Sequence, residues 1–186
     1  MSEKHDAAAQ LDGTQSQYVR EHLKSEQNLG LGILSGSLGA AIGAALWAVI
    51  TVVTGWQTGF MAIGIGFLVG YAMRTFGRGV DMPFGIAGGA LSLLGCLLGN
   101  LLSVCGFISI RENLPFLSVL SQLELSGIVD LMRETFSPMD LLFYGIAVYE
   151  GYRLSFRQMT DADLQAILKG PGHAAGLSAP PGRDGR

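Results

Sequence analysis

The sequence predicts an all-α fold: a polytopic transmembrane bundle of four glycine-rich helices, with an interfacial helix between the third and fourth spans. Two observations predict it. Three long runs, at 29–53, 56–74 and 83–110, are apolar, nearly free of charge and interrupted by glycine. Each is long enough to cross a hydrocarbon core of about 30 Å as a helix rising about 1.5 Å per residue. The 186-residue chain is also 49% hydrophobic and 15% charged, which is typical of one small membrane bundle.

Residues 1–28 are polar and mixed in charge, and they predict a cytoplasmic N-terminal segment with a short surface helix near Arg20 to Glu26. The basic start and short apolar stretch of a cleavable signal peptide are not apparent, so we expect the first span to insert and stay. The net charge of −3 is spread over the polar ends, without a basic block. It predicts no nucleic-acid partner.

Turn-forming and helix-starting residues between the apolar runs predict where the first three spans begin and end. Thr54 and Gly55 form a very short turn, so spans 29–53 and 56–74 are expected to make a hairpin. Pro83 opens the third span, 83–110, because a proline at a helix start loses no hydrogen bond. That span holds both cysteines, Cys96 and Cys105. They are nine residues apart and so lie on opposite faces of one helix, and we expect no disulfide between them.

Residues 114–136 predict a helix with one apolar side. Leu125, Ile128, Val129, Met132 and Phe136 recur at helical spacing opposite a polar side. Such a helix lies in the membrane interface or packs on its own bundle, and the pattern leaves both interpretations open.

The fourth span, 138–156, begins with a strong start signal: Ser137 as the cap, Pro138 in the first position and Asp140 three residues after the cap. Glu150 and the arginines that follow arrive after only about 10–12 apolar positions, short of a full span. It can still cross if its tyrosines sit at the headgroups and its arginines extend outward. Residues 158–186 are expected to form a short helix and a disordered cytoplasmic tail.

Lysine and arginine near the span ends predict the orientation. With four crossings, one side holds Arg20, Lys24, Arg74, Arg78, Arg153 and Arg157, and the other holds Arg111 and Arg133. The positive-inside bias then places both termini in the cytoplasm.

Small residues spaced by four predict close helix packing. The candidate packing glycines, one series for each of the three long spans, are Gly32, Gly36, Gly39 and Gly43, then Gly66 and Gly70, then Gly95 and Gly99. In lipid, helices associate through close backbone contact, so such rows mark packing surfaces. Packing within one bundle and self-association into an oligomer or pore are both open. The spacing excludes a dinucleotide-binding fingerprint.

Polar groups at membrane depth are the usual sign of transport or catalysis, and this chain offers two candidates, Asn100 and Glu150. A neighbouring helix can satisfy Asn100, and Arg153 can pair with Glu150 across one turn. The three histidines, His5, His22 and His173, are scattered in the polar ends, so the sequence predicts no metal site. It predicts no cofactor and no enzyme, because the spans lack a paired acid and base.

Three segments together resemble a family of small bacterial multi-pass membrane proteins. They are GWQTGFMAIGIGFLVGYAMR (55–74), LLGCLLGN (93–100) and FSPMDLLFYGIAVYEGYRLSFR (136–157). The resemblance covers about 29–157. It implies four spans in a bacterial cell (inner) membrane, and it carries no catalytic or binding residues to this chain.

The function expected from these observations is that of a structural or accessory component, which acts through helix contacts with partners in the membrane. Those partners are the lipid bilayer and either a homo-oligomer or another membrane protein. The alternative is a homo-oligomeric channel or small transporter whose path Asn100 and Glu150 line.

Overall fold

The computed structural model describes residues 21–56, 59–122, 127, 133 and 137–158. Residues Asn28–Arg157 belong to one compact unit, and the described residues before Asn28 belong to another. The described part of the first unit is helical outside its connections and contains no strand. The prediction of an all-α fold is confirmed for this part of the chain.

Helix α2, Leu29–Thr54, forms where the first span was predicted. The Asn28 side chain caps it by accepting a hydrogen bond of 3.0 Å from the Leu31 amide. Gly55 ends it in the left-handed conformation, φ 69°, which glycine adopts without a steric penalty.

Helix α3, Phe60–Ala72, begins four residues later than predicted, because Gly55 and Trp56 belong to the turn after α2. Beyond Ala72 the chain continues as a π-helical turn, η1, Met73–Gly77. This wider turn carries the helix past the predicted end at Arg74. The sequence did not predict this turn, which packs against α2.

Helix α4, Met82–Arg111, is the third span and has Pro83 in its first turn, as predicted. A short helix, α5, Phe116–Ser121, follows. The apolar face predicted at Leu125 to Phe136 lies outside the described residues, as do the predicted helix after Thr160 and the tail.

Helix α7, Pro138–Leu154, is the predicted fourth segment. Its capping box is confirmed: the Ser137 amide donates to Asp140 Oδ2 at 2.9 Å, and the Met139 amide donates to Ser137 Oγ at 3.2 Å. Asp140 therefore has a structural role at the helix start.

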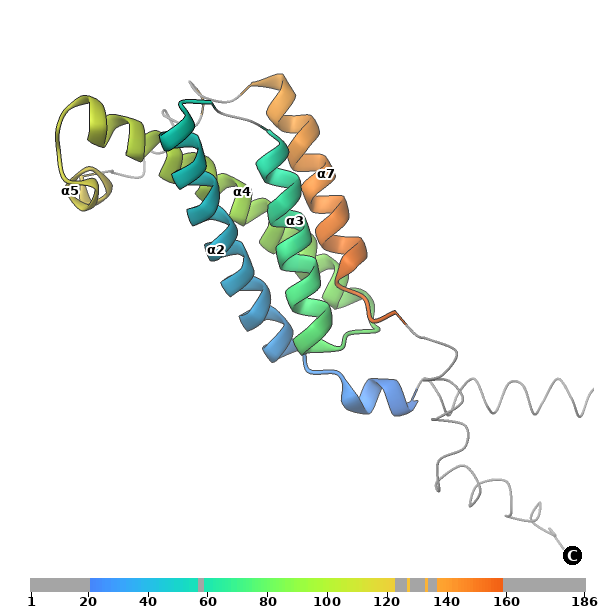
Figure 1. Ribbon diagram of the computed structural model, residues 1–186. Helices are drawn as coiled ribbons and strands as arrows, with labels where there is room; N and C mark the ends of the chain where they lie inside the picture. Colours follow the sequence, from blue (N-terminus) through green and yellow to red (C-terminus); the bar gives the residue numbers. More distant parts are fainter. Residues whose placement is uncertain (1–20, 57–58, 123–126, 128–132, 134–136, 159–186) are drawn as a thin grey trace, which may run out of the picture. The chain divides into compact units, whose positions relative to one another are not determined.

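Helices α2, α3, α4 and α7 lie side by side (Figure 1). Helix α3 packs against the other three, and α7 packs against α3 and α4. The core between them consists of a few large side chains among small ones, which are listed here: Trp47, Ile65, Val69, Met73, Phe84, Cys96 and Tyr144, with Ala40, Ala62 and Ala147.

One end of the bundle, which we call the loop end, is tied by two backbone hydrogen bonds to the connection between η1 and α4. The Asn28 amide donates to the Gly77 carbonyl at 2.9 Å, and the Arg157 amide donates to the Gly79 carbonyl at 2.8 Å. The start of α2 and the residues after α7 therefore meet the same short loop.

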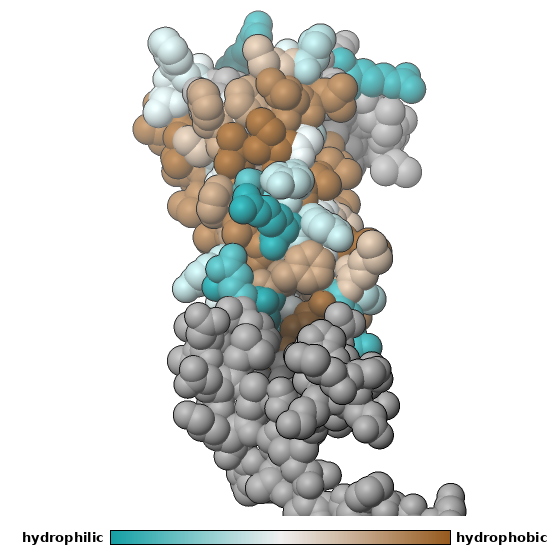
Figure 2. All heavy atoms as spheres, turned by 90° about the vertical axis from the view of Figure 1, so that its right-hand side faces the viewer, coloured by the Kyte–Doolittle hydropathy of each residue, from teal (hydrophilic) through white to brown (hydrophobic). Residues whose placement is uncertain are grey.

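In the described part of the chain, three helices are long and apolar enough to cross a membrane: Leu29–Thr54, Phe60–Gly77 and Met82–Arg111. Their outward side chains are large and apolar, with Leu34 68% exposed and Val53 79% exposed. On the face seen in Figure 2, hydrophobic surface fills much of the bundle, and hydrophilic residues gather at its upper edge and in its lower half. A multi-pass membrane protein has these properties.

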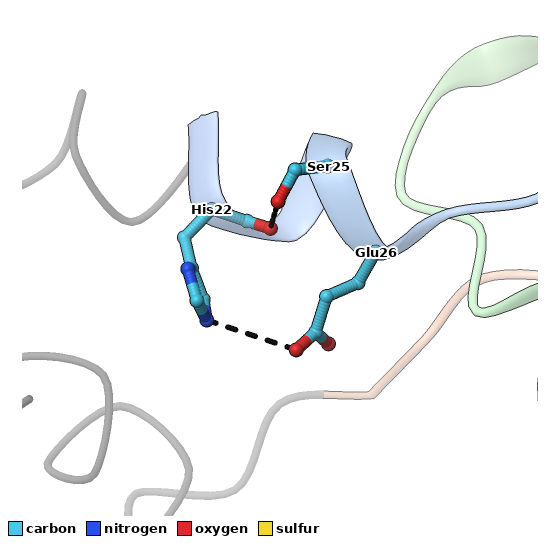
Figure 3. Close-up of polar contacts among 3 residues, drawn as sticks. All are labelled: His22, Ser25 and Glu26. Atoms are coloured by element: carbon cyan, nitrogen blue, oxygen red, sulfur yellow. Dashed lines mark hydrogen bonds and ion pairs between the residues drawn. The ribbon is translucent and has the colours of Figure 1, made fainter.

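In the other unit, residues 21–26 form a short helix, as predicted for this stretch. His22 Nε2 lies 3.7 Å from Glu26 Oε1, and Ser25 Oγ donates to the His22 carbonyl at 2.7 Å (Figure 3). Because the His22 and Glu26 side chains are partly exposed, the pair contributes little to stability.

Candidate functional site

The predicted packing glycines of α2 lie against α3, η1 and α4. A Cβ on Gly36 would lie 2.7 Å from Met73 Cγ, and one on Gly43 would lie 2.9 Å from Ile65 Cγ1. The remaining two are less crowded: Gly32 faces Phe84 at 3.1 Å, and Gly39 faces the Leu68 carbonyl oxygen at 3.1 Å. Side chains larger than hydrogen would push these helices apart.

The glycines of α3 and α4 also face neighbouring helices. A Cβ on Gly66 would lie 2.5 Å from the Ala147 carbonyl oxygen, and one on Gly70 would lie 2.6 Å from Leu154 Cβ. On α4, Gly95 faces Ile65 Cγ2 at 2.8 Å and Gly99 faces Trp47 Cε3 at 2.9 Å.

A close helix approach also joins α4 to α7, and its α7 residues were not predicted from the sequence. Ala147, Gly151 and Ser155 are spaced by four and face α3 and α4. A Cβ on Gly151 would overlap Ser92 Oγ, and one on Gly88 would overlap Ser155 Oγ. The four-residue spacing was a usable signal, because it matches the small-residue rows on the other spans.

One glycine of α3 and one of α7 have no such contact. A Cβ on Gly64 of α3 or Gly145 of α7 would meet no atom within 4 Å. Both residues are exposed on the bundle surface. Packing within this bundle therefore does not account for them, although glycine weakens a helix relative to alanine.

Asn100, the first predicted polar residue, is 1% exposed in the interior of the bundle. Its carboxamide lies beside the phenol of Tyr144 on the neighbouring helix α7. The Tyr144 ring in turn meets the Trp47 indole edge to face, with centroids 6.4 Å apart. Helices α2, α4 and α7 thus bring aromatic and polar groups together.

Thr51 lies one turn after Trp47 on the same side of α2 and is fully buried. Trp47, Thr51, Asn100 and Tyr144 are named here the buried polar cluster. Of these four residues, only Asn100 was predicted from the sequence, because tryptophan and threonine are ordinary constituents of apolar spans.

Glu150, the second predicted polar residue, is half-buried on α7. Its carbonyl oxygen lies 3.3 Å from the position of a Cβ on Gly70 of α3. Glu150 lies six residues after Tyr144, about 9 Å along the helix axis, so it stands at a different level from the buried polar cluster.

The two cysteines are free and buried, as expected. Cys96 Sγ lies 3.8 Å from the Ala62 carbonyl oxygen of α3. Among the described residues no group of three or more histidine, cysteine or acidic side chains is placed to hold a metal ion.

Apolar grooves run between helices on the outer surface. One, about 730 Å³, lies between α2 and α3 and includes Leu38 and Tyr71 in its walls. Another, about 450 Å³, lies between α4 and α7 and includes Gly89 and Gly145. Both are suited to apolar occupants such as acyl chains or helices.

Comparisons of the chain with protein-family models, curated proteins and solved structures found no match.

Proposed function

We propose that the chain is a four-span integral membrane protein of a bacterial inner membrane, with both termini cytoplasmic. The fourth crossing is supported by the pairing of α7 with α3. At one end, the Phe143 and Phe60 rings lie 5.1 Å apart. At the loop end, the Arg157 amide bonds to the Gly79 carbonyl, just beyond η1.

Helix α7 therefore accompanies the second span from its first residue to the loop that follows it. A helix that covers a crossing helix over this length crosses with it. Its 17 residues extend only about 25 Å, somewhat less than a typical hydrocarbon core. Local thinning of the bilayer and outward extension of Arg153 accommodate the difference.

Reporter fusions test this topology. Fusions after Gly79 and after Arg157 are expected to report the cytoplasm, and fusions after Gly55 and after Ser121 are expected to report the opposite side. A fusion after Arg157 that reports the same side as Ser121 would leave only three crossings.

Within the membrane, we propose a structural or accessory role exercised through helix contacts with a partner. Gly145 supports it, because it exposes bare backbone in the groove between α4 and α7 where no side chain of the bundle packs on it. Exposed glycine backbone permits the close approach by which membrane helices associate.

Site-directed cross-linking in native membranes tests the partner contact. Cys96 and Cys105 are replaced by alanine, and a photoreactive maleimide is attached to Gly145→Cys. A protein adduct is expected, whose mass distinguishes a second copy from another protein. Leu34→Cys, exposed on α2, is the control and is expected to capture lipid; lipid adducts alone at both positions would refute the proposed contact.

The alternative, a homo-oligomeric channel or small transporter, has weaker support. The buried polar cluster gives polar groups at depth, but Asn100 is engaged with Tyr144 and Glu150 stands about 9 Å farther along α7. This alternative predicts solute flux in proteoliposomes that Asn100→Leu or Glu150→Gln alters. Purified protein that leaves vesicles tight would exclude it.

A further inference from the structure

Two hydrogen-bonding groups of α2 are buried in the bundle without a hydrogen-bond partner among the described residues. They are the indole Nε1–H of Trp47 and the Oγ1 hydroxyl of Thr51. Trp47 is 1% exposed and Thr51 is 0% exposed, so neither group reaches the bundle surface. A buried polar group without a partner is costly, and the hydrocarbon around a membrane bundle offers it none.

Trp47 and Thr51 lie one turn apart on the same side of α2. The Trp47 ring packs on Gly99 of α4 and meets the Tyr144 ring of α7 edge to face. Gly106 of α4 faces Val52, so the parallel register of α2 and α4 sets Thr51 opposite Cys105, about 3 Å along the axis from Ser103. Ser103 Oγ donates to the Gly99 carbonyl at 2.7 Å.

Water fits the chemistry of this region. It accepts from an indole N–H, and it accepts from or donates to a threonine hydroxyl. Buried waters typically make about three hydrogen bonds to polar groups that the protein leaves unsatisfied. The Asn100 and Tyr144 side chains lie in the same cluster and offer further donors and acceptors.

We propose that the buried polar cluster is a hydration site, in which at least one bound water accepts from Trp47 Nε1–H and hydrogen-bonds Thr51 Oγ1. This site is independent of any partner contact at Gly145. The competing arrangement is a rotated Thr51 hydroxyl that bonds to the carbonyl four residues earlier, as threonine does in helices, with no water present.

Thr51→Val separates the two arrangements, because valine keeps the shape of threonine and removes only the hydroxyl. With the water bridge, the variant removes the hydrogen bond between Thr51 and the water and weakens the hold on that water, and the midpoint of thermal unfolding in detergent falls by about 2–4 °C. Thr75→Val is the matched control, because Thr75 Oγ1 bonds to the Tyr71 carbonyl on the exposed surface, and it leaves the midpoint unchanged. An unchanged or higher midpoint for Thr51→Val overturns the proposal.

Nuclear magnetic resonance of the wild-type chain detects the water without any core substitution. The chain has two tryptophans, and Trp56 is 75% exposed, so Trp56→Phe assigns the two indole signals. We expect a nuclear Overhauser cross-peak between the Trp47 indole proton and water. In the rotating-frame experiment this cross-peak has the opposite sign to one that arises from chemical exchange. Its absence under conditions where Trp56 shows a water contact overturns the proposal, even if Thr51→Val fails to fold.

Discussion

Gly88 of α4 and Gly151 of α7 face each other so closely that neither has room for a methyl group. A Cβ on Gly88 would lie 2.5 Å from the Gly151 carbonyl oxygen, and one on Gly151 would lie 2.8 Å from the Gly88 carbonyl oxygen. The contact is reciprocal and involves backbone on both sides, so a side-chain rotation cannot relieve it.

Gly151→Ala is therefore expected to destabilise the bundle by about 1–3 kcal/mol, the usual cost of overpacking. Unfolding in mixed micelles of mild detergent and dodecyl sulfate measures it. Gly145→Ala on the same helix is the control, and it is expected to be neutral or to stabilise by up to about 1 kcal/mol, because its methyl group meets open space. Equal effects of the two variants would contradict the close α4–α7 contact.

Phe84 is 2% exposed and fills the space beside Gly32, Gly77 and Gly79 at the loop end. Phe84→Ala is expected to cost about 3–5 kcal/mol, because the cavity removes contacts with three glycine backbones at once. Phe67→Ala, at an exposed position of α3, is expected to change stability by about 0.5 kcal/mol or less. Denaturation midpoints of the two purified variants compare them directly.

Ser35 joins α2 to the start of the π-helical turn. Its Oγ lies 3.2 Å from the Ala72 carbonyl oxygen and 3.0 Å from the Gly32 carbonyl oxygen. Ser35→Ala is expected to cost about 0.6 kcal/mol, the average for an interhelical hydrogen bond in a membrane protein. Ser121→Ala removes a bond within α5 alone and should leave the stability of the bundle unchanged in the same assay.

Cys96 and Cys105 are both fully buried. In the folded protein in mild detergent, neither is expected to react with a maleimide at the rate of a cysteine introduced at exposed Ser121. After denaturation in dodecyl sulfate, the mass should increase by two labels. Fast labelling of the native wild type would show that one of the helix contacts around the thiols opens readily.

The apolar runs were enough to predict three of the helices and most of their ends, because length and hydrophobicity decide whether a segment can cross a bilayer. The capping box of α7 was equally readable, since Ser137 and Asp140 act within one turn. The late start of α3 and the π-helical turn at Met73 could not be predicted from the sequence. The late start follows the turn at Gly55, and the π-helical turn lies where Gly77 packs against Gly32, a contact between residues far apart in the sequence.

The sequence predicted the packing residues of the three long spans more completely than those of α7. The row of Ala147, Gly151 and Ser155 has the same four-residue spacing, but it lies in a short segment with charged residues, which is less typical of a packing surface. The buried polar cluster was harder to predict from the sequence. The polar atoms of Trp47 and Thr51 are left without a hydrogen-bond partner only when the folded helices bury them. Periodicity alone does not show which apolar-looking residue carries an unsatisfied polar atom.

The hydrogen bonds at the loop end have a mechanical consequence. The carbonyls of Gly77 and Gly79 receive the amides of Asn28 and Arg157, which are the first and last residues of the bundle. Tension applied to either flanking segment would thus load the same three-residue stretch of backbone, and strain introduced there would be felt at both ends of the folded unit at once.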